Sequence, residues 1–312
     1  MENLFMPEGC RISQNANRDT LATPAGIEKA AENGDILEAT ALLCDRELNL
    51  HVDLGCMQGI IPRSEAVYMQ HGDEVKDIAI ISRVGKPVCF TVERITRSAA
   101  GNPVALLSRK NAQRRCVLHR LSHLRAGDII PVRVTHLERF GAFCDVGCGI
   151  CALLPLDCIS VSRIAHPSER LQPGMLLWCA VRAIDAHSGR ITLSLRELLG
   201  TWEENADLFA EGQTVRGIVR SVESYGIFVE LTPNLAGLAE YREDIRPGQT
   251  AAVYIKSIIP DKMKIKLIII DADDSPVIVT PLNYFIDPDR HTHIDYWKYS
   301  PPSCSKIIET VF

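Results

Sequence analysis

The chain has 312 residues, of which 46% are hydrophobic and 23% are charged, and its formal net charge at pH 7 is −5. This is the composition of a globular protein with roughly two or three domains. No run of about 18 apolar residues is present and residues 1–13 do not resemble a secretory signal, so we expect neither a membrane partner nor export. The 11 cysteines follow no framework of spacings, so we expect reduced thiols and a cytoplasmic location.

The first predicted element is a helix that begins after Thr23 and ends before Gly34. Thr23 is a good N-cap residue, Pro24 suits the first helical position, and glycine often follows the last turn of a helix. We assign residues 1–34 to an N-terminal segment that contains this helix.

Three similar units follow, and their second strands end in "HVDLG" (residues 51–55), "FCDVG" (143–147) and "FVELT" (228–232). Each unit contains five short stretches with strand-like alternation, separated by turns that contain glycine or proline. Five short strands in about 70 residues are typical of a small antiparallel barrel. We therefore predict an all-β fold of tandem five-stranded OB-fold barrels joined by short helices.

The domain boundaries follow from these units. We predict the N-terminal segment (1–34), a degenerate first barrel (35–108), a basic helical connector (109–124), a middle barrel (125–198), a helical linker (199–210), a third barrel (211–271) and a C-terminal extension (272–312). The third barrel is shortened between its third and fourth strands, where residues 240–248 correspond to 156–174 of the middle barrel.

Two units share a pattern of an aromatic residue, a glycine, any residue and a phenylalanine, which runs from Phe140 to Phe143 and from Tyr225 to Phe228. A β-bulge at the glycine would shift the side-chain phase and place both rings on the outer face of the barrel. Exposed rings stack on nucleic-acid bases, and each stacked base contributes about 1–3 kcal/mol. The alternative is that these aromatic residues simply fill a barrel.

The middle unit resembles the S-one domain, an RNA-binding barrel of the OB type named after bacterial ribosomal protein S-one. The resemblance rests on Gly-Asp (127–128), Phe-Gly-Ala-Phe (140–143), Pro-Gly (173–174), Ile-Asp (184–185) and Gly-Arg-Ile-Thr-Leu-Ser-Leu-Arg (189–196). The third unit matches less fully and the first mainly by the register of its strands. Together the three units cover about two thirds of the chain.

The resemblance implies further binding residues. The acidic position of the family falls on Asp185, and its basic position falls on Arg190 in the middle unit and on Lys264 in the third. A basic side chain there can pair with a phosphate, and an arginine can also stack on a base. The loop histidine of the family falls on Pro155 and Glu240, so both units depart from the pattern, and Glu240 would repel a phosphate.

The first unit holds Leu48 and His51 at the aromatic positions, so we expect no stacking platform there. Its "GIIPRSE" loop (59–65) loosely resembles N-terminal copies in bacterial S-one proteins, which serve in docking to the ribosome. This resemblance implies the small ribosomal subunit as a partner of the first barrel. The alternative is a barrel that only packs against its neighbour.

Residues 94–127 contain no aspartate or glutamate but eight arginines and lysines, which marks a basic segment in an acidic protein. An amphipathic helix with an exposed basic face is predicted from apolar residues at helical spacing, namely Val117, Leu118, Leu121 and Leu124. The RNA-binding candidates on this connector are Arg109, Lys110, Arg114 and Arg115. The alternative is a solvated helix face without a partner.

Two groups of residues could in principle bind a metal ion, but the sequence around each favours another interpretation. Four cysteines lie close together in the sequence, namely Cys144, Cys148, Cys151 and Cys158, but a structural zinc site usually needs two Cys-x-x-Cys pairs or nearby histidines. In the extension, His291 and His293 alternate, but the surrounding aromatic residues indicate burial against the third barrel or a partner. We expect no metal and no cofactor.

The best functional hypothesis is non-catalytic binding of single-stranded RNA, with the middle barrel leading and the third assisting. No P-loop, dinucleotide-binding motif, nucleophile elbow or pair of catalytic carboxylates is found, so no enzyme is predicted. The resemblance implies a role in translation with mRNA as the ligand. Three alternatives stay open: a protein-interaction scaffold of diverged barrels, an accessory protein of RNA decay or transcription, and a metal or redox protein.

Overall fold

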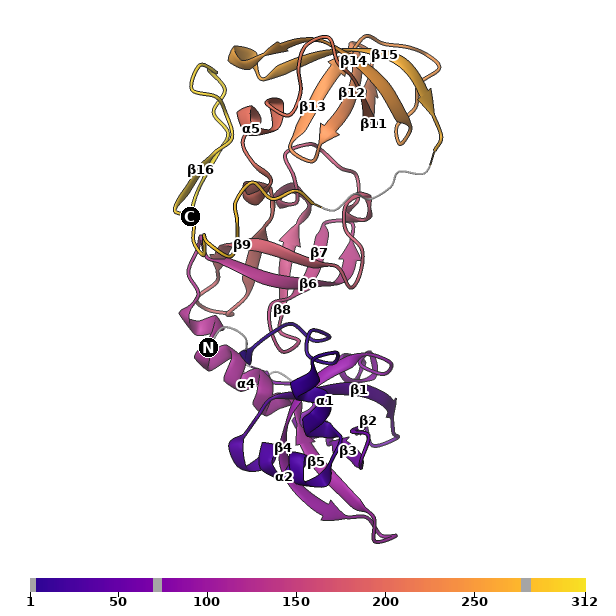
Figure 1. Ribbon diagram of the computed structural model, residues 1–312, viewed down its shortest axis with the longest axis vertical. Coiled ribbons are helices and arrows are strands. Elements are labelled where there is room, and N and C mark those ends of the chain that lie inside the picture. Colours follow the sequence, from indigo (N-terminus) through magenta and orange to yellow (C-terminus); the bar gives the residue numbers. More distant parts are fainter. Residues whose placement is uncertain (1–3, 70–74, 276–281) are drawn as a thin grey trace.

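The computed structural model describes residues 4–69, 75–275 and 282–312. Within these residues, three closed barrels of five strands follow one another along the long axis of the molecule (Figure 1). In each barrel the strands are neighbours in the order first, second, third, fifth and fourth, and the third and fifth strands pair in parallel. This architecture confirms the predicted all-β fold of tandem OB-type barrels.

The barrels are built from short strands. The first contains β1 (Leu37–Cys44), β2 (Leu50–Asp53), β3 (Gln58–Ile61), β4 (Pro87–Arg97) and β5 (Pro103–Ser108). The middle barrel contains β6 (Ile129–Glu138), β7 (Gly141–Asp145), β8 (Cys151–Pro155), β9 (Leu176–Ile184) and β10 (Ile191–Ser194). The third contains β11 (Thr214–Glu223), β12 (Gly226–Thr232), β13 (Leu235–Ala239), β14 (Thr250–Ile259) and β15 (Lys264–Asp273).

Short helices and one hairpin lie outside the barrels. The helices are α1 (Asn15–Leu21), α2 (Pro24–Asn33), α3 (Asp77–Ile81), α4 (Arg109–His119) and α5 (Trp202–Ala206). The hairpin belongs to the C-terminal extension and pairs β16 (Tyr296–Lys298) with β17 (Glu309–Val311). No helix in the described part of the chain is both long enough and apolar enough to cross a membrane.

One irregularity occurs at the same place in all three barrels. The register between the first and second strands shifts by one residue at a bulge, formed by Leu42, Thr135 or Arg220. Beyond the bulge, three cross-strand pairs occupy equivalent positions, namely Leu43–His51, His136–Phe143 and Ser221–Phe228. The three second strands are therefore structurally equivalent, as the sequence repeat predicts.

The N-terminal segment contains the predicted helix and packs on two barrels. Thr23 caps α2 by accepting a hydrogen bond of 3.1 Å from the N–H of Gly26, and Gly34 ends the helix in the left-handed conformation with φ 67°. Ile27 of α2 lies in the core of the first barrel, whereas Phe5 is 5% exposed and lies in the core of the middle barrel. The segment thus links the two barrels.

The basic connector forms α4, but its buried face differs from the predicted apolar stripe. Leu118 is 51% exposed, whereas Ala112 and Cys116 are fully buried. The helix begins at Arg109 and ends at His119, and a separate 3₁₀ turn follows at Leu121–His123. The stripe prediction is confirmed in part: Leu121 is 7% exposed, and Val117 and Leu124 pack against the same core, whereas Leu118 is exposed. The buried side of α4 also includes the charged residue Arg109.

The C-terminal extension crosses the middle and third barrels, and runs beside α5 in Figure 1. The N–H of Ile129 in the middle barrel donates to the carbonyl of Thr292 at 2.8 Å. Trp297 and Tyr299 are about 5% exposed and lie in the core cluster of the third barrel. Burial against the third barrel, one of the two alternatives for the aromatic residues of the extension, is therefore confirmed for Trp297 and Tyr299, whereas Tyr284 packs against the core of the middle barrel and Tyr296 is 50% exposed.

Candidate nucleic-acid interface

The hairpin of the middle barrel exposes a pair of aromatic rings. Glu138 pairs with Gly141, so only Arg139 and Phe140 form the turn between β6 and β7. Phe140 is 56% exposed, and its ring lies edge-on to that of Phe143 with 5.9 Å between centroids and 88° between planes. The imidazole of His136 stacks on the ring of Phe143 with 6.5 Å between centroids. Phe143 therefore contacts both other rings, and the three form one cluster.

The two phenylalanines share a face for a different reason than the predicted bulge at Gly141. The bulge lies on the opposite strand at Thr135, and Phe140 lies in the turn before β7 begins. Gly141 is needed because β8 passes close by: a Cβ there would lie 2.4 Å from the carbonyl oxygen of Leu154. The prediction of two outward rings agrees with the structure, whereas the role assigned to the glycine is wrong.

The third barrel repeats this geometry. Tyr225 lies in a two-residue turn, is 69% exposed, and is edge-on to Phe228 with 6.2 Å between centroids. A Cβ at Gly226 would lie 2.6 Å from the carbonyl oxygen of Ala239, which is the equivalent close approach. Lys264 is exposed and lines the same groove as both rings.

The first barrel has a longer hairpin loop and different chemistry. Cys44 pairs with Leu50, so five residues form the turn. Asp45 accepts hydrogen bonds from the N–H groups of Glu47 and Asn49 and contacts His51 Nε2 at 3.1 Å. These bonds lower the pKa of Asp45 to about 2, and the bond from the backbone N–H of Asn49 contributes most. His51 is therefore held within a polar cluster, and no ring pair is present on this face within residues 35–69 and 75–108.

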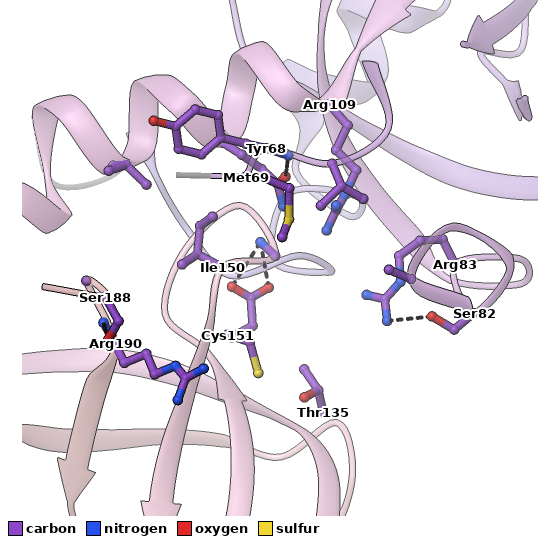
Figure 2. Close-up of a pocket in the computed structure, with 17 residues that line it drawn as sticks. Tyr68, Met69, Ser82, Arg83, Arg109, Thr135, Ile150, Cys151, Ser188 and Arg190 are labelled. Atoms are coloured by element: carbon purple, nitrogen blue, oxygen red, sulfur yellow. Dashed lines mark hydrogen bonds between the residues drawn. The ribbon is translucent and has the colours of Figure 1, made fainter. Parts of the chain in front are cut away.

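Arg190 lies at the edge of a cleft between the first and middle barrels. Asp185 shapes the hairpin before it by accepting hydrogen bonds from the N–H and hydroxyl of Ser188 and from the N–H of His187, and these bonds lower its pKa. The cleft has a volume of about 460 Å³. Arg190 and Arg83 reach into it from opposite sides (Figure 2). Asp185 is thus a turn residue that positions Arg190.

The connector candidates divide into exposed and structural residues. Lys110 and Arg114 are exposed. Arg109 is 3% exposed and its guanidinium donates to both carboxylate oxygens of Glu8 at 2.7 and 3.0 Å. Arg115 donates to the carbonyl of Gly34. The predicted exposure of Arg109 is therefore wrong, because a carboxylate 101 residues earlier in the chain pairs with it.

The acidic residue shared by the three second strands has a role that the sequence analysis missed. Asp145 is 2% exposed and accepts hydrogen bonds from the backbone N–H groups of Glu8, Gly147 and Gly149. Burial and the nearby charge of Glu8 raise the pKa of Asp145 to about 7. Asp145 thereby holds the N-terminal segment to the middle barrel.

Glu230 occupies the equivalent position in the third barrel and binds arginines instead. It is 5% exposed and accepts hydrogen bonds from Arg170 Nη1 and Arg220 Nε, each at 2.7 Å. Burial opposes its ionisation, but the bonds and charges of the two guanidinium groups hold its pKa below the ordinary value. Arg170 comes from the loop between β8 and β9, so this cluster joins the middle and third barrels. The repeated acidic position in the sequence was the available signal.

The cysteines show no arrangement suited to a metal ion. Cys144, Cys148 and Cys158 are buried, and burial raises the pKa of Cys144 above its ordinary value. Cys151 is exposed. Across residues 4–69, 75–275 and 282–312, no group of three or more His, Cys, Asp or Glu side chains could hold a metal ion. His293 instead bonds to Asp128 at 2.7 Å and to Asp295 at 3.0 Å.

No protein-family model matches the chain. It is 30% identical over 167 residues to the small ribosomal subunit protein bS1 of Leuconostoc lactis, which covers 50% of this chain and 39% of that protein. It is 27% identical over 267 residues to the bS1 homolog of Bacillus subtilis, covering 80% of this chain and 66% of that protein. The chain thus spans between about two fifths and two thirds of the length of these relatives.

Among solved structures, a multidomain protein with nucleic acid binding domains from Streptococcus pneumoniae is 15% identical and covers 75% of this chain and 72% of that one, with a TM-score of 0.24. A TM-score this low supports no conclusion about this chain. The sequence identity to the bS1 proteins and the three barrels do support a conclusion. The chain is a homologue of the small ribosomal subunit proteins bS1 and consists of three tandem S-one-type OB barrels.

Proposed function

We propose that the chain is a non-catalytic protein that binds single-stranded RNA, acting in translation in the cytoplasm as an mRNA-binding relative of bS1. The observation that carries this proposal is the edge-to-face pair of the exposed Phe140 and the half-buried Phe143, on which His136 stacks. Such a cluster of rings offers flat faces on which bases can stack. Stacking on rings is tolerant of sequence because every base has a π-face, and each base contributes about 1–3 kcal/mol.

Positive charges on the middle barrel and on α4 support binding of the phosphate backbone. Arg190 is exposed, and within the described chain its guanidinium has no hydrogen bond or ion pair. Arg83 and Arg109 also line the cleft between the first and middle barrels, but both are ion-paired with Glu8, so Arg190 supplies the free positive charge among the described residues there. Lys110 and Arg114 of α4 add exposed positive charges next to the first barrel. Lysine and arginine contacts to phosphate release counterions, so the affinity should fall as the salt concentration rises.

The first barrel differs on the equivalent face, and we assign it a docking role on a protein surface of the small ribosomal subunit. Leu42 and Leu43 are 57% and 48% exposed, and Leu43 pairs with His51 where the middle barrel pairs two rings. Exposed aliphatic residues favour a protein partner over bases. Co-sedimentation with small subunits should weaken for Leu43→Asp. Unchanged co-sedimentation would contradict the docking role.

The RNA proposal is tested by measuring the affinity for a labelled single-stranded RNA against salt concentration. The Phe140→Ala/Phe143→Ala variant should lose about 2–6 kcal/mol of binding free energy if two bases stack. Tyr254→Ala is a matched control, because Tyr254 is 38% exposed on β14 and belongs to neither ring pair. Equal, weak binding by the wild type and the double variant would overturn the proposal and favour the protein-interaction scaffold.

A further inference from the structure

A groove on the third barrel is walled on one side by the C-terminal extension. The groove has a volume of about 510 Å³. The barrel contributes the ring pair of Tyr225 and Phe228, and the extension contributes Tyr299, Lys306 and Ile308. Neither the repeat pattern nor the position of the extension in the sequence predicts this contribution, because Lys306 lies 42 residues beyond Lys264.

The extension is anchored firmly enough to act as a wall. The Tyr299 carbonyl accepts a hydrogen bond of 3.0 Å from the N–H of Trp202, and its hydroxyl donates to the carbonyl of Asn234. The N–H of Tyr299 donates to the carbonyl of Ile308 at 2.9 Å, and the N–H of Ile308 donates to the hydroxyl of Ser300 at 2.8 Å. Lys306 therefore projects from a hairpin loop whose base is fixed in the core of the third barrel.

The charge of this groove is complementary to a nucleic-acid strand. Its lining contains three lysines, namely Lys262, Lys264 and Lys306, and none of the described residues that line it is an aspartate or glutamate. All three lysines are exposed, and the exposed ring of Tyr225 and the half-buried ring of Phe228 line the same groove. A groove that combines a positive lining with aromatic stacking surfaces is the common arrangement for single-stranded nucleic acid.

We infer that the C-terminal extension completes an RNA-binding groove on the third barrel, in which Lys306 contacts a phosphate of the strand whose bases stack on Tyr225 and Phe228. The inference rests on the proposed function and extends it to a segment outside the three repeats. The occupant is single-stranded RNA, because the rings need unpaired bases and the lysines need a phosphate backbone.

The test measures the salt dependence of RNA affinity for the full chain carrying Phe140→Ala/Phe143→Ala, so that base stacking on the middle barrel is removed and the third barrel supplies the ring pair. Adding Lys306→Ala should reduce the slope of log affinity against log salt by about 0.7, the value for one phosphate contact to a single strand. Adding Lys256→Ala should leave the slope unchanged, because Lys256 is exposed on β14 and does not line the groove.

The outcomes separate this inference from the proposed function. If Lys306→Ala leaves the slope unchanged while Lys264→Ala lowers it, the extension does not contact the strand and the inference is overturned. If Lys306→Ala and Lys256→Ala lower the slope equally, the effect reflects general charge and the inference is again overturned. If the chain without these substitutions fails to bind RNA, the proposed function itself fails. Thermal unfolding of each variant checks that the substitutions leave the fold intact.

Discussion

Two junctions join the three barrels, and both are built on the same strand position of the repeat. Asp145 of the middle barrel holds the N-terminal segment through backbone N–H groups, whereas Glu230 of the third barrel holds Arg170 and Arg220. Both carboxyl groups are at least 95% buried. The pKa of Asp145 is raised by burial and by Glu8, and that of Glu230 is lowered by its arginines despite burial. The same position therefore responds to pH in opposite ways, depending on its partners.

The largest effect is expected from Glu230→Ala. The substitution leaves Arg170 and part of Arg220 buried without a counter-charge, and breaking a buried pair in this way typically costs about 3–5 kcal/mol. Urea unfolding followed by tryptophan fluorescence should show the loss, because Trp202 and Trp297 are buried in the third barrel. A loss below about 1 kcal/mol would mean that the cluster does not stabilise this junction.

Smaller effects on stability are expected from a change of pH, and they run in opposite directions for Glu230 and Asp145. The folded-state pKa of Glu230 lies below its ordinary 4.5, so the stability it contributes is present above about pH 4.5 and is lost as the pH falls. The folded-state pKa of Asp145 is raised from 3.8 to about 7, so its contribution is complete below pH 3.8 and is lost as the pH rises through 7.

Hydrogen exchange measured at pH 5 and pH 8, corrected for intrinsic rates, separates these two responses. The amides of Glu8 and Gly147 should be better protected at pH 5, and Asp145→Asn should reduce that difference. If the amides of Glu8 and Gly147 are equally protected at both pH values, the upward shift assigned to the pKa of Asp145 is contradicted.

The smallest effect is expected from Asp53→Asn. Asp53 occupies the same strand position in the first barrel, but it is exposed and bonds only to the N–H of Gly55 at 2.8 Å within the described chain. Substitutions at such surface positions usually change the free energy of unfolding by less than about 0.5 kcal/mol. A larger change in the free energy of unfolding would show that the first barrel also uses this position to hold another segment of the chain.

Local patterns predicted local structure well. The cap residues Thr23 and Gly34 predict α2 to the residue, and the alternating stretches predict the barrel strands. The spacing of Phe140 and Phe143 predicts a pair of outward rings. These predictions succeed because each depends on residues that are neighbours in the chain.

Contacts between distant segments could not be predicted in the same way. The burial of Arg109 depends on Glu8, and the role of Gly141 depends on how closely β8 passes. The contribution of Lys306 to the groove depends on the anchoring of Tyr299 against Asn234. In each case the deciding partner lies elsewhere in the sequence, and no local period or motif identifies it.

The hydrogen bond between Glu8 and Asp145 also has a consequence for biosynthesis. The two residues are 137 positions apart, so Glu8 leaves the ribosome roughly 7–27 seconds before Asp145 at a synthesis rate of about 5–20 residues per second. During that time the first barrel can close, but Phe5 has no core to enter. Attachment of Phe5 and Glu8 to the middle barrel is therefore a late step, and it occurs only after this barrel has been translated and folded.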